Sequence, residues 1–340
     1  METKSYKKTF RNLLVFLILI FLTLWIIFKD QSINEIINTI SKVKIQYVLI
    51  GIVCMIIYLT LEAVNLGRTL KVLGEKSTFL KNLKYAFIGF FFSSITPAAS
   101  GGQPMQIYYM HKEKISVANS TIALLINLSS MQIITISFAL ISLCFNYQYL
   151  NTALVIFFII GISLNATALA LLLIGIFSKR LSKWMIDFAF KIMKFFKVKN
   201  LDQKREKMED ELLKYQSNAK LLKENKPLIA KTIITTAIQF IFYYSISYCT
   251  YRSFGFSESN ILEVISMQSV LFATVSGIPS PGAVGVSEGA FIEIFRNIYP
   301  EELIRSATLV SRAINFYLFV LIGGITVIVN DIKLARKVEE

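Results

Sequence analysis

Long apolar segments recur along the whole chain and constrain its fold more than any other feature. A helix needs roughly 20 apolar residues to cross the ~30 Å hydrocarbon core of a bilayer. Six segments approach or exceed that length: residues 12–28, 45–66, 117–145, 151–176, 228–251 and 300–329. Because lipid offers backbone groups no hydrogen-bond partner, such segments are predicted to be helices. With 54% hydrophobic and 17% charged residues, the chain is expected to be an all-α polytopic membrane protein, one membrane domain over residues 1–340.

Two further apolar segments are broken by proline and glycine and are too short to cross the membrane twice. The first, residues 80–110, is broken at Thr96–Pro104, and the second, residues 261–298, is broken at Pro279–Gly289. Each is predicted to be a re-entrant helical pair, two half-helices that meet at a broken tip. Lipid tolerates such a tip only where it is buried in protein or lines a wet cavity. We name the two breaks the first tip and the second tip.

The two tips match when the chain is shifted by 184 residues. The identical pairs are Pro97 with Pro281, Ala99 with Ala283, and Gly101 with Gly285. The same shift aligns the flanking apolar segments without a gap and defines two units, residues 45–145 and 229–329, each a span, a re-entrant pair and a span. Three full spans separate the starts of the units, so the units are predicted to face opposite ways. Such an inverted repeat is common in transporters, where the substrate site lies at the helix breaks.

The basic residues predict the orientation of the chain. With the N-terminus inside, 29 of the 36 Lys and Arg fall on the cytoplasmic side, which satisfies the positive-inside rule and predicts that both termini are cytoplasmic. The first apolar segment is interpreted as a retained span, because no small-residue cleavage site follows it. The net charge of +14 therefore reflects membrane topology, and no nucleic-acid partner is expected.

Between the units, residues 178–226 are expected to form cytosolic amphipathic and charged helices. Residues 178–196 carry apolar side chains on one face and basic ones on the other, the pattern of a helix in the membrane surface. The helix over residues 201–226 has one narrow apolar seam amid many charges. This seam is interpreted as a cover for the inner ends of the spans, with a dedicated partner site as the alternative.

Charged residues inside apolar segments are the first candidates for function, because a charge near the middle of the membrane costs about 2.5–3.5 kcal/mol on insertion scales. Glu288 lies at the second tip, where the start of a half-helix favours a carboxylate. Arg312 lies in the last span and is predicted to pair with Glu288. Two interpretations of this pair remain open, a substrate site and a structural pin.

Three other charged residues lie near the ends of spans. Glu62 and Arg68 lie near the inner end of the second span, and the shift of 184 places Arg68 on Arg252. The two arginines either hold lipid phosphates or only extend towards the membrane surface. The single histidine, His111, is expected to be a solvated surface group. The sequence shows no catalytic, metal-ligand or nucleotide-binding pattern, so no cofactor is expected.

The two tips resemble those of a known family. The sequences TPAASGGQP over Thr96–Pro104 and PGAVGVSEG over Pro281–Gly289 are similar to the TPxxxGGEP and PGGxGxxEG segments of the lysylphosphatidylglycerol synthase transmembrane, or flippase-like, domain. Arg312 also agrees, and the resemblance covers about residues 10–330. The first tip departs from the family pattern, because Gln103 stands where Glu is frequent and Gln106 where Arg often follows.

The resemblance implies a multi-pass protein of the bacterial inner membrane that handles lipids. Well-known members carry a cytosolic synthase domain that transfers lysine from charged tRNA to phosphatidylglycerol, and their membrane part is thought to flip the product. This chain is expected to be a stand-alone member, because it ends at Glu340.

The expected function is therefore a flippase or transporter of (aminoacyl-)phospholipid or a related lipid, with the headgroup at the two tips. The alternatives are a phosphatidylglycerol lysyltransferase and a non-transporting membrane partner of a separate synthase; enzymatic activity of this chain alone is not expected. The expected ligand is an anionic phospholipid or lipid-linked substrate, and self-association is left open. The candidate substrate-binding residues are Glu288, Arg312, Pro281, Gly282, Gly285, Pro97, Gly101, Gly102, Gln103, Arg68 and Arg252.

Overall fold

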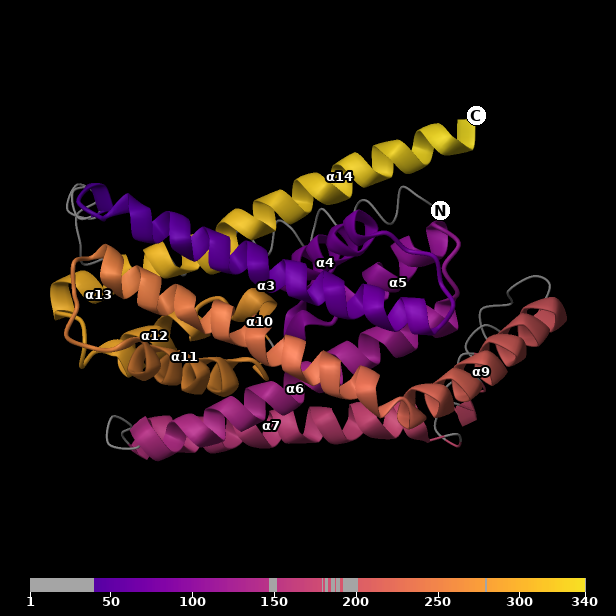
Figure 1. Cartoon of the computed structure of the whole chain (residues 1–340), viewed down its shortest axis with the longest axis horizontal. Coiled ribbons are helices and arrows are strands. Elements are labelled where there is room, and N and C mark those ends of the chain that lie inside the picture. The colour runs from indigo at the N-terminus through magenta and orange to yellow at the C-terminus, as the bar shows by residue number, and fades with distance from the viewer. Residues whose placement is uncertain are drawn as a thin grey trace.

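The computed structural model describes residues 40–146, 152–178, 201–278 and 280–339, together with single positions between 180 and 191. Every regular element in these residues is helical (Figure 1). The α-helices are α3 (Ile45–Val72), α4 (Phe79–Ser94), α5 (Gly102–Lys112), α6 (Val117–Asn146), α7 (Thr152–Phe177), α9 (Leu201–Glu224), α10 (Lys226–Ser253), α11 (Ile261–Val275), α12 (Val286–Phe295), α13 (Glu301–Arg312) and α14 (Leu318–Glu339). Three short elements join them: the 3-10 turns η1 (Pro97–Ala99) and η3 (Pro281–Ala283), and one π-helical turn, η4 (Ala313–Tyr317).

Five helical segments are long and apolar enough to cross a membrane, and they coincide with five of the six predicted spans. They are Ile45–Val72, Val117–Cys144, Leu154–Phe177, Lys226–Ser253 and Glu301–Leu334. The first expected span, residues 12–28, and most of the expected surface helix over residues 178–196 lie outside the described residues. The protein is thus an all-helical polytopic membrane protein, as predicted.

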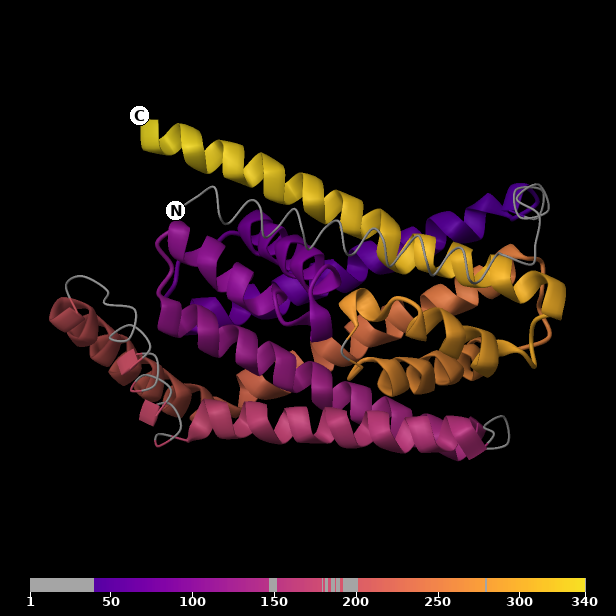
Figure 2. The same ribbon diagram turned by 180° about the vertical axis from the view of Figure 1, so that it is seen from behind.

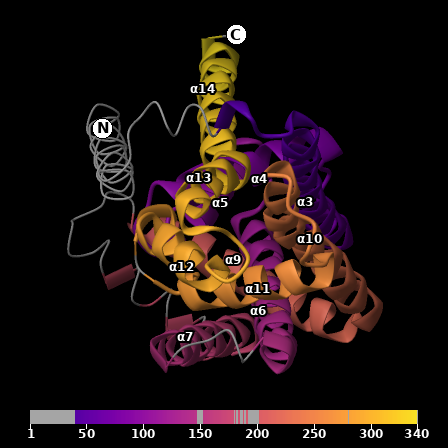
Figure 3. The same ribbon diagram turned by 90° about the vertical axis from the view of Figure 1, so that its left-hand side faces the viewer.

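The helix α7 lies at the edge of the bundle and exposes many large apolar side chains. Figure 3 shows α7 at the periphery, beside α6. It exposes large apolar side chains, among them Ile156, Phe157 and Ile159. A helix that is apolar on its exposed face is expected where lipid rather than water surrounds it.

The helices α3 and α10 pack against each other in antiparallel orientation along their whole length. At one end the Lys44 amide donates a hydrogen bond to the Ser253 carbonyl (2.8 Å), and at the other the Asn65 amide donates to the Thr236 hydroxyl (3.0 Å). Gly51 lets α3 approach η4 closely, because a Cβ atom there would lie only 3.2 Å from the Ile314 side chain. The helices α3 and α10 open the two expected units, and their antiparallel packing is the arrangement that an inverted repeat requires.

Each of the two units contains one broken helical pair. In the first, α4 and α5 are joined through η1, and in the second, α11 and α12 are joined through η3. A shift of 184 residues places η1 on η3 and the first residue of α5 on the first residue of α12. The two tips contact each other. Whether the pairs enter the membrane from opposite sides stays a prediction.

Each unit contributes its last span to the other unit's broken pair. From the first unit, α6 packs on α11, where the Ser142 and Ser269 hydroxyls are 2.7 Å apart. From the second unit, α14 packs on α4, where Gly323 lies against Phe91. The two units are therefore interlaced, as the paths of α6 and α14 in Figure 2 also show.

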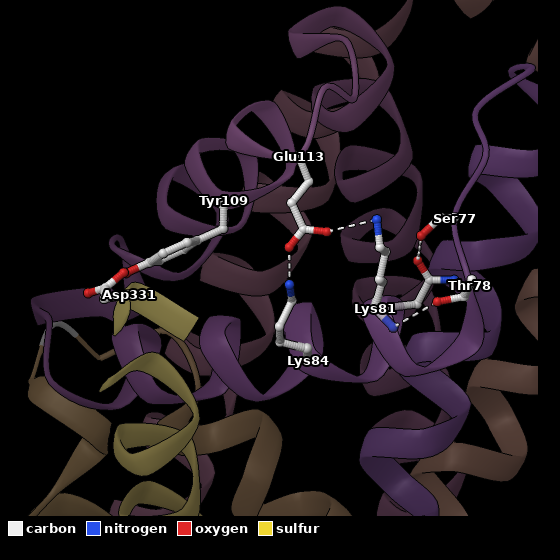
Figure 4. Close-up of polar contacts among 8 residues, drawn as sticks. Ser77, Thr78, Lys81, Lys84, Tyr109, Glu113 and Asp331 are labelled. Atoms are coloured by element: carbon white, nitrogen blue, oxygen red, sulfur yellow. Dashed lines mark hydrogen bonds and ion pairs between the residues drawn. The ribbon is translucent and has the colours of Figure 1, made fainter. Parts of the chain in front are cut away.

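Polar contacts join α4, α5 and α14 at the end of the first broken pair that is opposite its tip, where α4 begins and α5 ends. Figure 4 shows the Glu113 carboxylate between Lys81 and Lys84, with which it forms ion pairs. The Tyr109 hydroxyl donates to the Asp331 carboxylate (2.8 Å) and so joins α5 to α14. The open ends of α4 and α5 are thereby held at a fixed separation.

The charged helix α9 closes over the ends of α6 and α7. The Glu211 carboxylate accepts hydrogen bonds from the Ala118 amide (2.8 Å) and the Ser116 hydroxyl (3.0 Å), which satisfies the start of α6. The apolar side of α9 is buried here, with Leu222 only 1% exposed. The seam of this helix thus covers the ends of spans, which was the favoured interpretation.

Candidate functional site

The second tip has a backbone that only a small residue can adopt at its centre. Gly282 has a φ of 59° and Gly285 a φ of 87°, both in the left-handed region that favours glycine. A Cβ atom on Gly282 would collide with the ring of Phe316 and lie 3.1 Å from the Ser94 carbonyl oxygen at the end of α4. Glycine at this position therefore lets the second tip approach both α4 and the last span.

Glu288 belongs to the first turn of α12, which begins at Val286 as the sequence predicts. One of its carboxylate oxygens accepts a hydrogen bond from the Gly285 amide (2.7 Å). This amide is one of the unsatisfied donors at a helix start, where a negative charge is also favoured by the helix dipole. Glu288 is only 2% exposed, so its charge depends on partners within the protein.

Arg312 is the main partner of Glu288, and the predicted pair is present. Its Nε donates to Glu288 Oε1 (2.7 Å), and its Nη2 donates to the Gly282 carbonyl (3.0 Å). The guanidinium also lies 4.0 Å from the centre of the Phe316 ring, and the Tyr317 hydroxyl donates to Glu288 Oε1 at 3.4 Å. Arg312 therefore binds the carboxylate and the backbone of the second tip together, while it is 8% exposed.

A cavity of about 320 Å³ lies between the two tips. Its wall includes Ala98 and Ala99 of the first tip, Gly282 and Ala283 of the second, and Arg312. The volume is at the lower end of the range for small-molecule sites, ~300–1,000 Å³, and such sites combine apolar walls with a few polar groups. The polar members of this wall include Gln103, Gln106, Asn127, Gln132, Asn165, Gln268, Ser311 and Asn315.

The structure brings only some of the predicted site residues to this cavity. Arg312, Gly282 and Gln103 line it. Glu288 lies behind Arg312, as its hydrogen bond shows. The remaining tip residues shape the backbone of the two breaks without lining the cavity: Pro97, Gly101, Gly102, Pro281 and Gly285.

Gly102 shows what these backbone positions do. A Cβ atom at Gly102 would lie 2.9 Å from the Gly89 carbonyl oxygen and would collide with Ser93, both on α4. The glycine therefore lets α5 approach α4 closely at the tip. The function of the tip glycines as ligand contacts stays a prediction.

Arg68 and Arg252 lie away from the cavity, at opposite ends of the α3 and α10 pair. Arg68 donates to the Asn65 side chain (3.1 Å) and the Thr235 hydroxyl (3.2 Å). Arg252 donates to the Tyr47 hydroxyl (3.3 Å). Each arginine bridges the two helices through neutral groups, and a role in holding lipid phosphates stays a prediction.

The sequence predictions assigned no role to Glu62 and, apart from Gln103 and Gln106 at the first tip, did not include the amide side chains of the cavity wall. Glu62 lines the cavity from α3, and the Gln106 amide donates to it at 3.5 Å and to the Tyr85 carbonyl at 3.0 Å. Asn165 of α7 donates to the Ala273 carbonyl (3.1 Å) and so fixes α7 to the end of α11. Amide side chains within apolar spans are the signal that could have identified these positions.

The described residues around the cavity combine a buried ion pair with hydrogen-bonding amide side chains. Within the described residues, no group of three or more His, Cys, Asp or Glu could hold a metal ion. The features that stand out are a buried ion pair, a set of amides and a cavity between two broken helices.

These features define a polytopic, all-helical membrane protein with a cavity between its two broken helices, lined by both apolar and polar side chains. Over residues 12–323 the chain matches the family described as the lysylphosphatidylglycerol synthase TM region, and it belongs to that family. The resemblance read from the two tips is thereby confirmed.

Two archaeal relatives match along nearly their whole length. The chain is 24% identical over 334 residues to UPF0104 membrane protein PH1989 of Pyrococcus horikoshii, covering 95% of this chain and 97% of the relative. It is 19% identical over 334 residues to a UPF0104 membrane protein of Archaeoglobus fulgidus, covering 91% and 94%. These relatives therefore have the membrane region in stand-alone form.

Proposed function

We propose that this protein moves a phospholipid, an aminoacylated phospholipid or a related lipid across the membrane, with the headgroup passing through the cavity between the two tips. The observation that carries the proposal is the cavity itself, which both broken helices form jointly and whose wall includes Arg312. A polar headgroup needs such a path, because its transfer into hydrocarbon without hydrogen-bond partners costs several kcal/mol, roughly 4–8 per polar group.

The helix arrangement supports the same proposal. The two tips contact each other, and the helices α3 and α10 that open the two units are antiparallel. In transporters built from inverted repeats, the substrate site lies where the breaks meet, and one repeat rocks against the other. On this proposal the protein resides in the cell membrane with both termini in the cytoplasm.

The test is transbilayer movement of headgroup-labelled lipids in liposomes that contain the purified full chain. Phosphatidylglycerol and aminoacylated phosphatidylglycerol would be compared for the wild type, Glu288→Gln and Arg312→Ala. We expect each variant to slow movement by about tenfold or more, because the pair orders the wall of the cavity. Glu258→Gln, at an exposed loop position, is the matched control and should keep the wild-type rate.

Movement no faster than in empty liposomes with every lipid offered would contradict the proposal. Lysylphosphatidylglycerol formed by this chain alone, from phosphatidylglycerol and charged tRNA, would favour the lysyltransferase alternative. Tight association with a separate synthase without any lipid movement would favour the membrane-partner alternative.

A further inference from the structure

Two arginines outside the cavity have no acidic partner. Arg68 and Arg252 occupy equivalent positions in the two units and bridge α3 and α10 through neutral side chains. Within the described residues, neither forms an ion pair, whereas Arg205, Arg296 and Arg312 each pair with a glutamate. An arginine side chain keeps its proton in proteins. The seam between α3 and α10 therefore carries a fixed positive charge at each end that the described residues do not compensate.

Each of the two guanidinium groups is oriented and still has donors to offer. The hydrogen bonds of Arg68 and Arg252 use Nη1 and Nη2, so the Nε–H of each has no acceptor in the described part of the chain. The Arg252 guanidinium also lies 5.5 Å from the ring centre of Tyr47 and 5.9 Å from that of Tyr248. A phosphate is the anion that best matches such a planar group with several donors.

The separation of the two arginines matches the thickness of a membrane. Arg68 follows Tyr47, the partner of Arg252, by 21 positions on α3, and Arg252 follows Thr235, the partner of Arg68, by 17 positions on α10. At 1.5 Å per residue, the two ends of the seam are about 26–32 Å apart. The hydrocarbon core of a bilayer is ~30 Å thick. One arginine is therefore expected near the phosphates of each leaflet.

The surface of α10 between the two ends suits acyl chains. Ile234, Ile238 and Ile241 are exposed. They precede Arg252 by 18, 14 and 11 positions, so all four side chains lie on one face of the helix, within about 40° of each other. The helix α10 contains no acidic residue that could repel a phosphate. An apolar stripe that ends at a guanidinium is complementary to a lipid with acyl chains and a phosphate.

We infer that Arg68 and Arg252 each bind the phosphate of a membrane phospholipid, one in each leaflet, on the outer surface of the α3 and α10 seam. The ligand class is a diacyl phospholipid, recognised by its phosphate and its acyl chains rather than by the rest of its headgroup. The two sites lie outside the cavity and do not depend on transport. Because each arginine joins α3 of the first unit to α10 of the second, a bound phospholipid contacts both units.

Native mass spectrometry of the purified full chain in detergent tests these sites. Stepwise dissociation constants would be measured for dioleoyl phosphatidylglycerol and for dioleoylglycerol, which has the same acyl chains and no phosphate. We expect the wild type to bind the phospholipid at least about fivefold more tightly, the effect of one basic residue near an anionic headgroup. Equal affinity for the two lipids would overturn the inference without any variant.

Variants then assign the phosphate contacts to the two arginines. Arg68→Gln and Arg252→Gln should each weaken one dissociation constant for phosphatidylglycerol about fivefold, and the double variant should weaken two. Binding of dioleoylglycerol should stay the same. The matched control is Arg296→Gln, because Arg296 is exposed and already paired with Glu293, and it should bind both lipids like the wild type.

Two results with the variants would contradict these sites. Unchanged affinity for phosphatidylglycerol in the double variant would show that the arginines only bridge the helices. An equal loss of affinity for both lipids would show disturbed packing instead of a lost phosphate contact. Thermal unfolding in lipid-free detergent checks the fold of each variant, and Arg68→Lys and Arg252→Lys, which keep the charge, should bind phosphatidylglycerol more tightly than the Gln variants.

The outcomes also separate these sites from the proposed function. Arginine-dependent binding of phosphatidylglycerol without transbilayer movement retains the two sites and contradicts transport. Rapid transbilayer movement, with unchanged binding in the double variant, retains transport and removes the two sites.

Discussion

The two tips share a left-handed backbone at their centres, but they differ in the backbone of the residues that follow and in their charges. In the first tip, Ala98 and Ala99 have φ values of 51° and 53°, and in the second, Gly282 and Ala283 have values of 59° and 51°. The charged pair of the second tip has no counterpart in the first. With the shift of 184 residues, Pro104 stands in the place of Glu288 and Leu128 in the place of Arg312.

The first unit, in contrast, has a charged residue, Glu62, that the second unit lacks. The residue of the second unit that corresponds to it is Ile246, which is fully buried and apolar. Each unit thus contributes a different charged group to one shared cavity, Glu62 from the first and Arg312 with Glu288 from the second. The comparison teaches that the chain keeps the left-handed centre of each tip and places different charged groups in the two units.

The largest difference between the two units is expected when one member of the buried Glu288–Arg312 pair is removed. Arg312→Ala leaves Glu288 buried without its counter-ion, which typically costs about 3–5 kcal/mol. Leu128→Ala, at the corresponding position of the first unit, removes only apolar contacts of a partly exposed side chain and should cost about 1 kcal/mol. The free energy of unfolding in detergent micelles, from a denaturant titration, measures both effects.

A double variant separates charge from packing at the same site. Replacing Glu288 and Arg312 together by Met should recover most of the stability lost in Arg312→Ala, because no unpaired charge remains. If Arg312→Ala were no less stable than Leu128→Ala, the second tip would not depend on the pair.

The second prediction exchanges the residues at the centres of the two tips. Gly282→Ala places a side chain in the left-handed region, which costs roughly 1–2 kcal/mol, and also displaces Phe316 from its position beside Arg312. Ala98→Gly removes the same backbone penalty from the first tip, and the greater flexibility of the unfolded chain offsets part of the gain. Gly282→Ala should therefore lower stability by at least about 2 kcal/mol, and Ala98→Gly should raise it by less than about 1.

Thermal unfolding of the two variants in the same detergent measures this difference. Equal loss of stability in both would show that the two tips do not share their backbone strain.

The smallest expected effect concerns Glu113, whose corresponding residue in the second unit is the uncharged Asn297. Partial burial works to raise the pKa of the Glu113 carboxyl, but hydrogen bonds from Lys84 and Lys81 outweigh it and hold the pKa below its ordinary value of 4.5. Because the pKa is lower in the folded state, the stabilisation is complete above pH 4.5 and is lost as the pH falls through the folded-state pKa.

Glu113→Gln should therefore destabilise the protein by about 0.5–1 kcal/mol at neutral pH, as expected for a partly exposed ion pair. The difference from the wild type should shrink as the pH falls below 4.5. Thermal unfolding from pH 3.5 to 7, values chosen around that pKa, measures it. A difference that stays constant over this range would exclude the ion pairs as its cause.

Much of the fold could be predicted, because it follows from the local properties of the residues along the chain. The lengths of the apolar segments identified the spans, and the prolines and glycines identified the two breaks, because both signals act locally along the chain. The pairing of Glu288 with Arg312 was also predictable, because two opposite charges in an apolar environment need each other.

The composition of the cavity wall was harder to predict because it depends on how the units interlace. Helices without a distinct apolar face, such as α6, carry no periodic signal that shows which face points inward. The contribution of Asn127, and the position of Asn315 on the π-helical turn after Arg312, therefore became visible only in the three-dimensional arrangement.

The interlaced packing of the last spans also sets an order in which the protein can be completed during synthesis. The helix α6 precedes its neighbour α11 in the chain and is synthesised before it. In contrast, α4 is synthesised long before its neighbour α14. The first tip thus lacks its full cover until α14 has been made. Synthesis of the second unit, rather than insertion of the first, therefore sets the moment at which the cavity can close.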